Sequence, residues 1–231
     1  MKNQSMRQLL LLLATLPIGM ASASEPLQTA PVHPALAHAP TRAYTRAGVP
    51  GDPINIAFVG SEDDLLRTMA AAHWDPADPI TLRSSMRITV DSIVRRAYVD
   101  APVSTLLIEG RKQDLAFEQP AARGPSKRHH VRYWRIDTVD NLGRPLWLGA
   151  ATYDVSIGVS HTGWHVTHHI AADIDDERNK LLADIETAGA VAVTWLDDFQ
   201  PDREGRNGGG DPYHTDGRLA IVTTRAPSPQ K

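Results

Sequence analysis

The chain has 231 residues, of which 42% are hydrophobic, and its 24 Lys and Arg against 27 Asp and Glu give a formal net charge of −3 at pH 7. Because it has no basic excess of the kind that attracts a phosphate backbone, no nucleic-acid partner is expected. The chain contains no cysteine, which excludes disulfides, thiolate catalysis, thiolate zinc sites and cysteine-ligated iron–sulfur clusters. A metal bound here would have His, Asp and Glu ligands.

The N-terminus has the three-part order of a secretory signal peptide. Lys2 and Arg7 precede an apolar run from Leu9 to Ile18, and the small residues Ala21 to Ala23 follow. A helix needs roughly 20 apolar residues to span a bilayer, so this shorter run predicts cleavage after Ala23 rather than a permanent anchor. Cleavage leaves 22 basic and 27 acidic residues, a formal charge of −5. The predicted destination is the periplasm, with no transmembrane segment in the mature chain.

After the signal peptide at 1–23, the chain divides into a leader, a domain and a tail. Residues 24–50 are rich in Ala, Pro and Thr without a sustained period, which predicts a flexible leader. Residues 51–224 have the length of a single domain. Residues 225–231 form a short polar stretch with two prolines, which predicts a disordered tail.

The first part of the domain predicts one strand and two helices. The apolar, β-branched run at 54–59 favours a strand. Ser61, with Asp64 three residues later, resembles a capping box and opens a helix expected over 62–73. A second helix is expected over 79–101, where apolar residues recur at helical spacing and a proline follows the last turn.

The second part of the domain is mainly strands. A hairpin is predicted between 104–109 and 114–118. Further strands are expected at 129–136, 146–153, 165–170, 190–195 and 218–223, with a Gly-rich surface loop at 203–211. A helix that starts near Asp173 and ends at Gly189 lies among them. This order predicts a single α+β domain with a mixed or mostly antiparallel sheet and about three helices.

The segment from Arg128 to Trp134, which reads RHHVRYW, is the first that can carry chemistry. Alternation along a strand places His130 and Arg132 on one face and His129 on the other. Only one of the two histidines can therefore belong to a given site. Asp154, at the end of the next strand, either completes a His/Asp metal set or is a turn residue.

The second segment joins His168 and His169 to a helix start that carries Asp173, Asp175 and Arg178. Unpaired backbone N–H groups at such a start attract an anion, and Arg178 can add a hydrogen-bond fork. Asp173 or Asp175 with a nearby imidazole offers instead the ligands of a divalent cation. The same acids also suit a structural role as N-cap and first-turn residues. The sequence leaves these alternatives open.

Together with several shorter matches, the two motifs resemble the LssY C-terminal domain family. The shorter matches are Pro53-Ile54-Asn55, Phe58, Gly60, Trp74, Ala101-Pro102, Gly110-Arg111 and Asp114-Leu115-Ala116-Phe117. The resemblance covers residues 51–199. Family members include large membrane proteins that join this domain to DedA-like and PAP2 phosphatase-like segments, which implies a cell-envelope role near lipid phosphates. The resemblance assigns no catalytic residue, and it implies an inner-membrane protein partner or peripheral contact for any work at the membrane.

Two functions fit these observations. The first is a cell-envelope hydrolase of phosphate or ester groups, in which imidazoles act as metal ligands or as acid and base while arginines stabilise negative charge. The second is a non-catalytic accessory domain that binds an anionic envelope ligand, such as a lipid phosphate, at the helix start. A purely structural role, with these side chains in buried hydrogen bonds, is the third reading.

The candidate residues of a catalytic site are His129, His130, Arg132, His168, His169, Asp173, Asp175 and Arg178. The cofactor that this set suggests is a divalent metal ion. Its candidate ligands are His130, His168, Asp154 and Asp173.

Overall fold

The computed structural model describes residues 33–77, 105–121, 127–159, 166–189 and 191–224. The predicted signal peptide, the second predicted helix at 79–101 and the predicted tail at 225–231 lie outside these residues.

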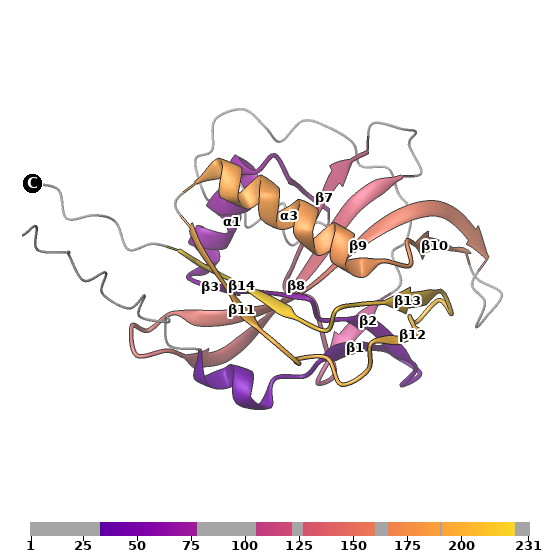
Figure 1. Ribbon diagram of the computed structural model, residues 1–231, viewed down its shortest axis with the longest axis horizontal. Helices are drawn as coiled ribbons and strands as arrows, with labels where there is room; N and C mark the ends of the chain where they lie inside the picture. Colours follow the sequence, from indigo (N-terminus) through magenta and orange to yellow (C-terminus); the bar gives the residue numbers. More distant parts are fainter. Residues whose placement is uncertain (1–32, 78–104, 122–126, 160–165, 190, 225–231) are drawn as a thin grey trace, which may run out of the picture. The chain divides into compact units, whose positions relative to one another are not determined.

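A mixed sheet of eight strands carries the fold, in the order β11-β14-β3-β9-β8-β7-β4, with β10 paired to the far end of β9 (Figure 1). The strands are β3 (Ile56–Val59), β4 (Asp75–Pro76), β7 (Leu115–Pro120), β8 (Arg128–Val139), β9 (Pro145–Val159), β10 (Val166–Ile170), β11 (Val191–Leu196) and β14 (Leu219–Thr224). β14 and β3 are parallel, and the other pairs of this sheet are antiparallel. The predicted α+β class and the mixed sheet are confirmed.

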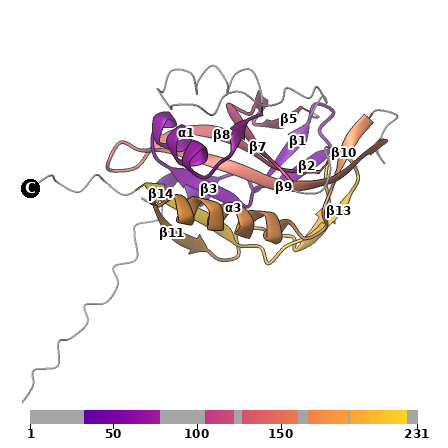
Figure 2. The same ribbon diagram turned by 90° about the horizontal axis from the view of Figure 1, so that it is seen from above.

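Two helices, α1 (Glu62–Ala71) and α3 (Ile174–Ala188), cover one face of this sheet (Figures 1 and 2). α1 starts at the predicted capping box, in which Ser61 and Asp64 each bind the other's backbone N–H. The apolar sides of both helices pack on the strands in one cluster that includes Leu65, Leu181 and Tyr133. The described residues hold two α-helices rather than about three, and the missing one is the helix predicted outside them.

A smaller sheet and a 3-10 helix, η1 (Pro34–His38), cover the opposite face (Figure 1). The small sheet has the order β2-β1-β5-β6, with β1 (Arg42–Thr45), β2 (Pro50–Pro53), β5 (Leu106–Ile108) and β6 (Arg111–Lys112). Leu36, Leu106 and Trp134 belong to the apolar cluster between the two sheets. The large sheet is therefore buried on both faces, which explains why every residue of β3 is buried.

The range predicted as a flexible leader contributes to this layer. η1 and β1 both lie within residues 24–50, where the composition alone favours a chain without fixed structure. Leu36 and Ala43 are the reason for the difference, because both are buried in the cluster between the sheets. Two buried residues within a stretch rich in Ala and Pro form no period that a sequence pattern can detect.

The hairpin predicted between 104–109 and 114–118 is wrong. β5 pairs with β6 through a two-residue turn at Glu109 and Gly110, which have φ values of 50° and 79°. Such a turn reverses the chain earlier than expected. β7 therefore does not pair with β5 and pairs with β8 in the large sheet instead. The Gly-rich loop is also more ordered than predicted, since β12 (Glu204–Arg206) pairs with β13 (Pro212–His214) around it.

Asn55 joins three parts of the fold from a site that is 1% exposed. Its Nδ2 donates to the carbonyl oxygens of Ala151 (2.9 Å) and Ile174 (3.2 Å). Its Oδ1 accepts the N–H of Ala151 at 2.9 Å. The start of β3, the middle of β9 and the first turn of α3 thus share one amide. No described helix is long and apolar enough to cross a membrane.

Replacement of Asn55 by Ala is expected to lower the free energy of unfolding by about 3 kcal/mol, because it leaves buried backbone groups without partners. Urea unfolding followed by circular dichroism measures this difference. Asn141→Ala, in an exposed turn, is the matched control and should change stability by less than about 0.5 kcal/mol. Equal effects at the two positions would contradict the role given to Asn55.

Candidate functional site

Strand β8 divides the first histidine motif between the two faces of the large sheet, as the alternation predicts. Tyr133 belongs to the cluster under the helices and Trp134 to the cluster between the sheets. His129 lies on the helix side, where its ring centroid is 4.8 Å from that of Tyr153. His130 and Arg132 lie on the side of the small sheet.

A group of ionisable side chains gathers on the small-sheet side, which we call the polar face. It consists of Asp52, Glu118, Arg128, His130, Arg132, Asp154, His169 and Asp211. The register of the strands brings them together, since Glu118 lies opposite His130 and Asp154 lies opposite Arg128. Five of them are at most 6% exposed. Charges so far from water have to be balanced within the protein.

Arg128 connects three strands of the polar face. Its Nη1 donates to Glu118 Oε2 on β7 at 2.9 Å, and its Nε donates to Asp154 Oδ2 on β9 at 3.2 Å. Burial raises the pKa of both carboxyls, and that of Asp154 reaches about 6 although Arg128 opposes the rise. A carboxyl with a pKa of about 6 and a second carboxyl whose pKa is raised therefore lie beside a permanent cation.

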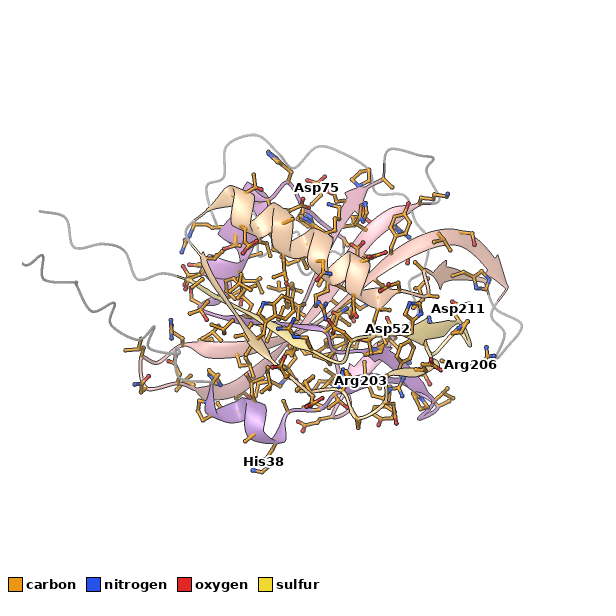
Figure 3. The ribbon with its side chains drawn as sticks, in the orientation of Figure 1. His38, Asp52, Asp75, Arg203, Arg206 and Asp211 are labelled. Atoms are coloured by element: carbon orange, nitrogen blue, oxygen red, sulfur yellow. The ribbon has the colours of Figure 1, made fainter. Side chains whose placement is uncertain are left out.

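Arg132 joins the two sheets, because its Nη1 donates to Asp52 Oδ2 on β2 at 2.9 Å. Burial raises the pKa of Asp52, while Arg132 and Arg42 lower it and the neighbouring carboxylate of Asp211 raises it further. Figure 3 shows Asp52 and Asp211 at the end of the molecule where β12 and β13 lie. The polar face thus extends from β2 to the loop that carries Asp211.

His169 and Asp211 form a carboxylate–imidazole pair on this face, with 2.6 Å between Nδ1 and Oδ1. The second carboxylate oxygen accepts the N–H of Ile170 (3.2 Å) and Nδ2 of Asn207 (3.4 Å). An ionised carboxylate accepts and cannot donate, so its partner in such a pair is a protonated Nδ1, and the neutral ring then has its lone pair on Nε2. A Cβ at Gly158 would lie 2.5 Å from this Nε2, so only glycine leaves room for the ring.

A second pair of this kind lies on the opposite face. His129 Nδ1 is 2.7 Å from Oε2 of Glu177, a residue of α3 that is 3% exposed. Burial raises the pKa of Glu177. Among the described residues, its other oxygen, Oε1, has no hydrogen-bond partner. This is where the first motif touches the second.

The acids at the start of α3 are engaged in capping. Asp173 is the N-cap and accepts the N–H groups of Asp175 and Asp176. Asp175 accepts the hydroxyl of Thr215 (2.8 Å) and the N–H of Asp216 (2.5 Å). The donors that an anion would need at this helix start are thus used by the carboxylates of the chain itself.

Arg178, which is 1% exposed, has no donor to offer either. Its Nε and Nη2 donate to Asn179 Oδ1, and Nη2 also donates to Asp216 Oδ2. Its Nη1 donates to Asp216 Oδ1 and to the carbonyl oxygen of Arg218. All five N–H groups are satisfied, and the guanidinium stacks on Trp195 with its carbon 4.9 Å from the ring centroid.

The structure therefore distributes the candidate residues over three places. His130, Arg132, Asp154 and His169 lie on the polar face, His129 lies under α3, and Asp173, Asp175 and Arg178 lie in the helix cap. His168 belongs to β10, and its side chain lies outside the described residues. Sequence reasoning did not select Asp52, Glu118, Arg128 or Asp211. Arg128 belongs to the first motif but was not chosen from it, and no local pattern marks the others.

His130 and His169 share a face but lie apart. Thr152 lies opposite His130 and Ser156 lies opposite His169, four residues further along β9, which corresponds to roughly 13 Å. Among the described residues, no three His, Asp or Glu side chains are grouped so as to hold a metal ion.

Residues 36–219 match the family model of the LssY C-terminus. The chain belongs to the LssY C-terminus family. The match begins in η1 and ends at the first residue of β14, so it includes the whole polar face. No curated protein and no solved structure matches the chain.

The LssY C-terminus domain also has an open groove of about 460 Å³ at the other end of β8. Its wall includes His38, Arg111, Arg135 and Asp137. Arg111 is paired with Asp114. The groove and the polar face lie at opposite ends of the same strand, so the groove adds no group to the polar face.

The raised pKa of Asp154 predicts a pH dependence of stability. Protonated Asp154 stabilises the fold at pH values below the ordinary carboxyl pKa, and this contribution is lost as the pH rises through about 6. The rise from 3.8 to about 6 corresponds to about 3 kcal/mol. The stability of wild type relative to Asp154→Asn should therefore fall by up to that amount between about pH 4 and about pH 7.

Urea unfolding at a series of pH values measures this difference. Asp137→Asn, at an exposed position of β8, is the control and should follow the wild-type curve. A difference between wild type and Asp154→Asn that stays constant or grows with pH would contradict the raised pKa of Asp154.

Proposed function

We propose that this LssY C-terminus domain is a hydrolase of phosphate or ester groups and that the reaction takes place on the polar face. The observation that carries the proposal is the 2.6 Å contact between His169 Nδ1 and buried Asp211. A carboxylate in this position fixes the imidazole tautomer and stabilises the imidazolium that forms when Nε2 takes a proton. Imidazole is the side chain that exchanges protons near neutral pH.

Each step of a hydrolysis has a group on the polar face. His169 Nε2 accepts a proton from water, whose oxygen forms the new bond to phosphorus or to carbonyl carbon. The positive charge of Arg132, which also lowers the pKa of Asp154, favours the negative charge that develops on the substrate. The bond to the leaving oxygen breaks, and that oxygen takes a proton from Asp154, whose pKa is raised to about 6 by burial.

The accessory-domain reading lacks comparable support. It places an anionic ligand at the start of α3, where Asp173 and Asp175 already accept from the nearby backbone. The donors of Arg178 are all engaged. The polar face offers both a base and a cation, so it favours the hydrolase.

The first test is hydrolysis of p-nitrophenyl phosphate and p-nitrophenyl acetate by wild type and Asp211→Asn. Asp211→Asn should lower kcat by roughly 10²- to 10⁴-fold with a small change in KM, because the asparagine amide does not orient and stabilise the His169 imidazole as a base. His169→Gln should lose as much, and the double variant no more than either single variant, since the two residues act as a unit.

His129→Gln is the matched control, because His129 is also paired with a buried carboxylate but on the opposite face. It should keep the wild-type kcat. Loss of activity in His129→Gln with activity kept in Asp211→Asn would move the reaction to the helix side. Hydrolysis of neither probe by wild type would remove the support for a hydrolase.

We also propose that the mature chain works in the periplasm, where an anionic envelope ligand such as a lipid phosphate is available. The order of charged, apolar and small residues from Lys2 to Ala23 supports export. Intact-mass measurement of protein from the periplasmic fraction should give a chain that begins at Ser24. Protein that still carries Met1 and stays in the cytoplasm would count against export.

A further inference from the structure

Two buried arginines of this domain are used in opposite ways. Arg178 donates through all five N–H groups. Arg132 is also buried, at 6% exposure. Within the described residues, however, it donates a single hydrogen bond, from Nη1 to Asp52, and its buried Nε–H has no acceptor. Among the described residues, Arg178 therefore has acceptors for all of its N–H groups, whereas Arg132 does not.

The incomplete part of Arg132 is one edge of the guanidinium. Nε and Nη2 point their N–H groups in parallel along this edge, while Nη1, on the other side, is held by Asp52. Two parallel N–H groups match two oxygens of a phosphate or a carboxylate. Because Nε is shielded from solvent, an oxygen that reaches it has little competition from water.

We infer that the Nε/Nη2 edge of Arg132 is the receptor for the phosphate group of the substrate. The inference rests on the hydrolase proposed for this same face and narrows its substrates to phosphate esters. An uncharged ester cannot balance the charge of the guanidinium. A phosphate accepts hydrogen bonds from both Nε and Nη2 through two of its oxygens, and its other oxygens can bind neighbouring groups.

The neighbouring groups on the polar face fit a phosphate. Arg128 donates to Glu118 and Asp154, whereas the buried Nε–H of Arg132 has no acceptor among the described residues. Burial raises the pKa of the Asp154 carboxyl to about 6. A carboxyl that holds its proton can donate to a phosphate oxygen instead of repelling it.

Isothermal titration of the full chain with inorganic phosphate tests the receptor directly. Arg132→Lys keeps the positive charge but loses the two-pronged edge, so the dissociation constant for phosphate should rise at least about tenfold. Arg135→Lys is the matched control, an arginine on the same strand at an exposed position, and should bind phosphate as wild type does. Equal binding by wild type and a folded Arg132→Lys overturns the inference.

Asp52→Asn tests the same receptor in the opposite direction. It removes the negative charge that lies 2.9 Å from Arg132 Nη1 and keeps the shape of the side chain. Phosphate affinity should rise several-fold, because the guanidinium is no longer neutralised. This variant decides the question if Arg132→Lys does not fold, since unchanged or weaker binding by Asp52→Asn contradicts the inference.

Binding to lipid vesicles distinguishes a lipid headgroup from a soluble phosphate ester as the source of the phosphate group. Phosphatidic acid carries a phosphate monoester. Phosphatidylcholine carries a phosphate diester whose negative charge is balanced by the choline group, so this lipid has no net charge. Binding to phosphatidic acid vesicles that depends on Arg132 and is displaced by inorganic phosphate identifies a lipid headgroup. Binding of inorganic phosphate alone identifies a soluble phosphate ester, and vesicle binding that does not need Arg132 counts against the inference.

The two proposals fail separately. If phosphate binds through Arg132 but wild type hydrolyses neither nitrophenyl ester, the receptor remains and the hydrolase does not. If hydrolysis depends on His169 while Arg132→Lys binds phosphate like wild type, the hydrolase remains and the receptor does not.

Discussion

Burial of the large sheet on both faces is the constraint on which the rest of this structure depends. Helices α1 and α3 cover one side, and the small sheet with η1 covers the other. Side chains alternate between the two sides, so strand β8 cannot point a charged residue to bulk water along its buried half. Arg132 and His129 therefore have partners on other elements, Asp52 on β2 and Glu177 on α3.

The same constraint separates the chemistry of the two histidines. His129 and His130 are adjacent in sequence, yet the sheet lies between their side chains. His129 serves the contact between β8 and α3, whereas His130 contributes to the polar face with Arg132. A substitution at one position therefore changes groups that the other does not touch, although both belong to one sequence motif.

Local features of the fold could be predicted from sequence, and partner choice could not. The capping box at Ser61 and the alternation along β8 depend on residues within a few positions of one another, and both are confirmed. The pairing of β5 with β6 depends on a turn of two residues that the sequence alone did not distinguish from a longer one. Long-range pairs leave no local trace, since Asp52 is 80 positions from Arg132 and Asp211 is 42 from His169.

Strand β14 has a consequence for the order in which the chain can fold. It is the last strand of the described residues, yet it lies between β11 and β3, and its residue Ala220 pairs with Ile56 near the beginning of the domain. Until β14 is available, β3 and β11 present open edges, and contacts between such distant residues form late. The sheet can close only after almost the whole domain has been synthesised.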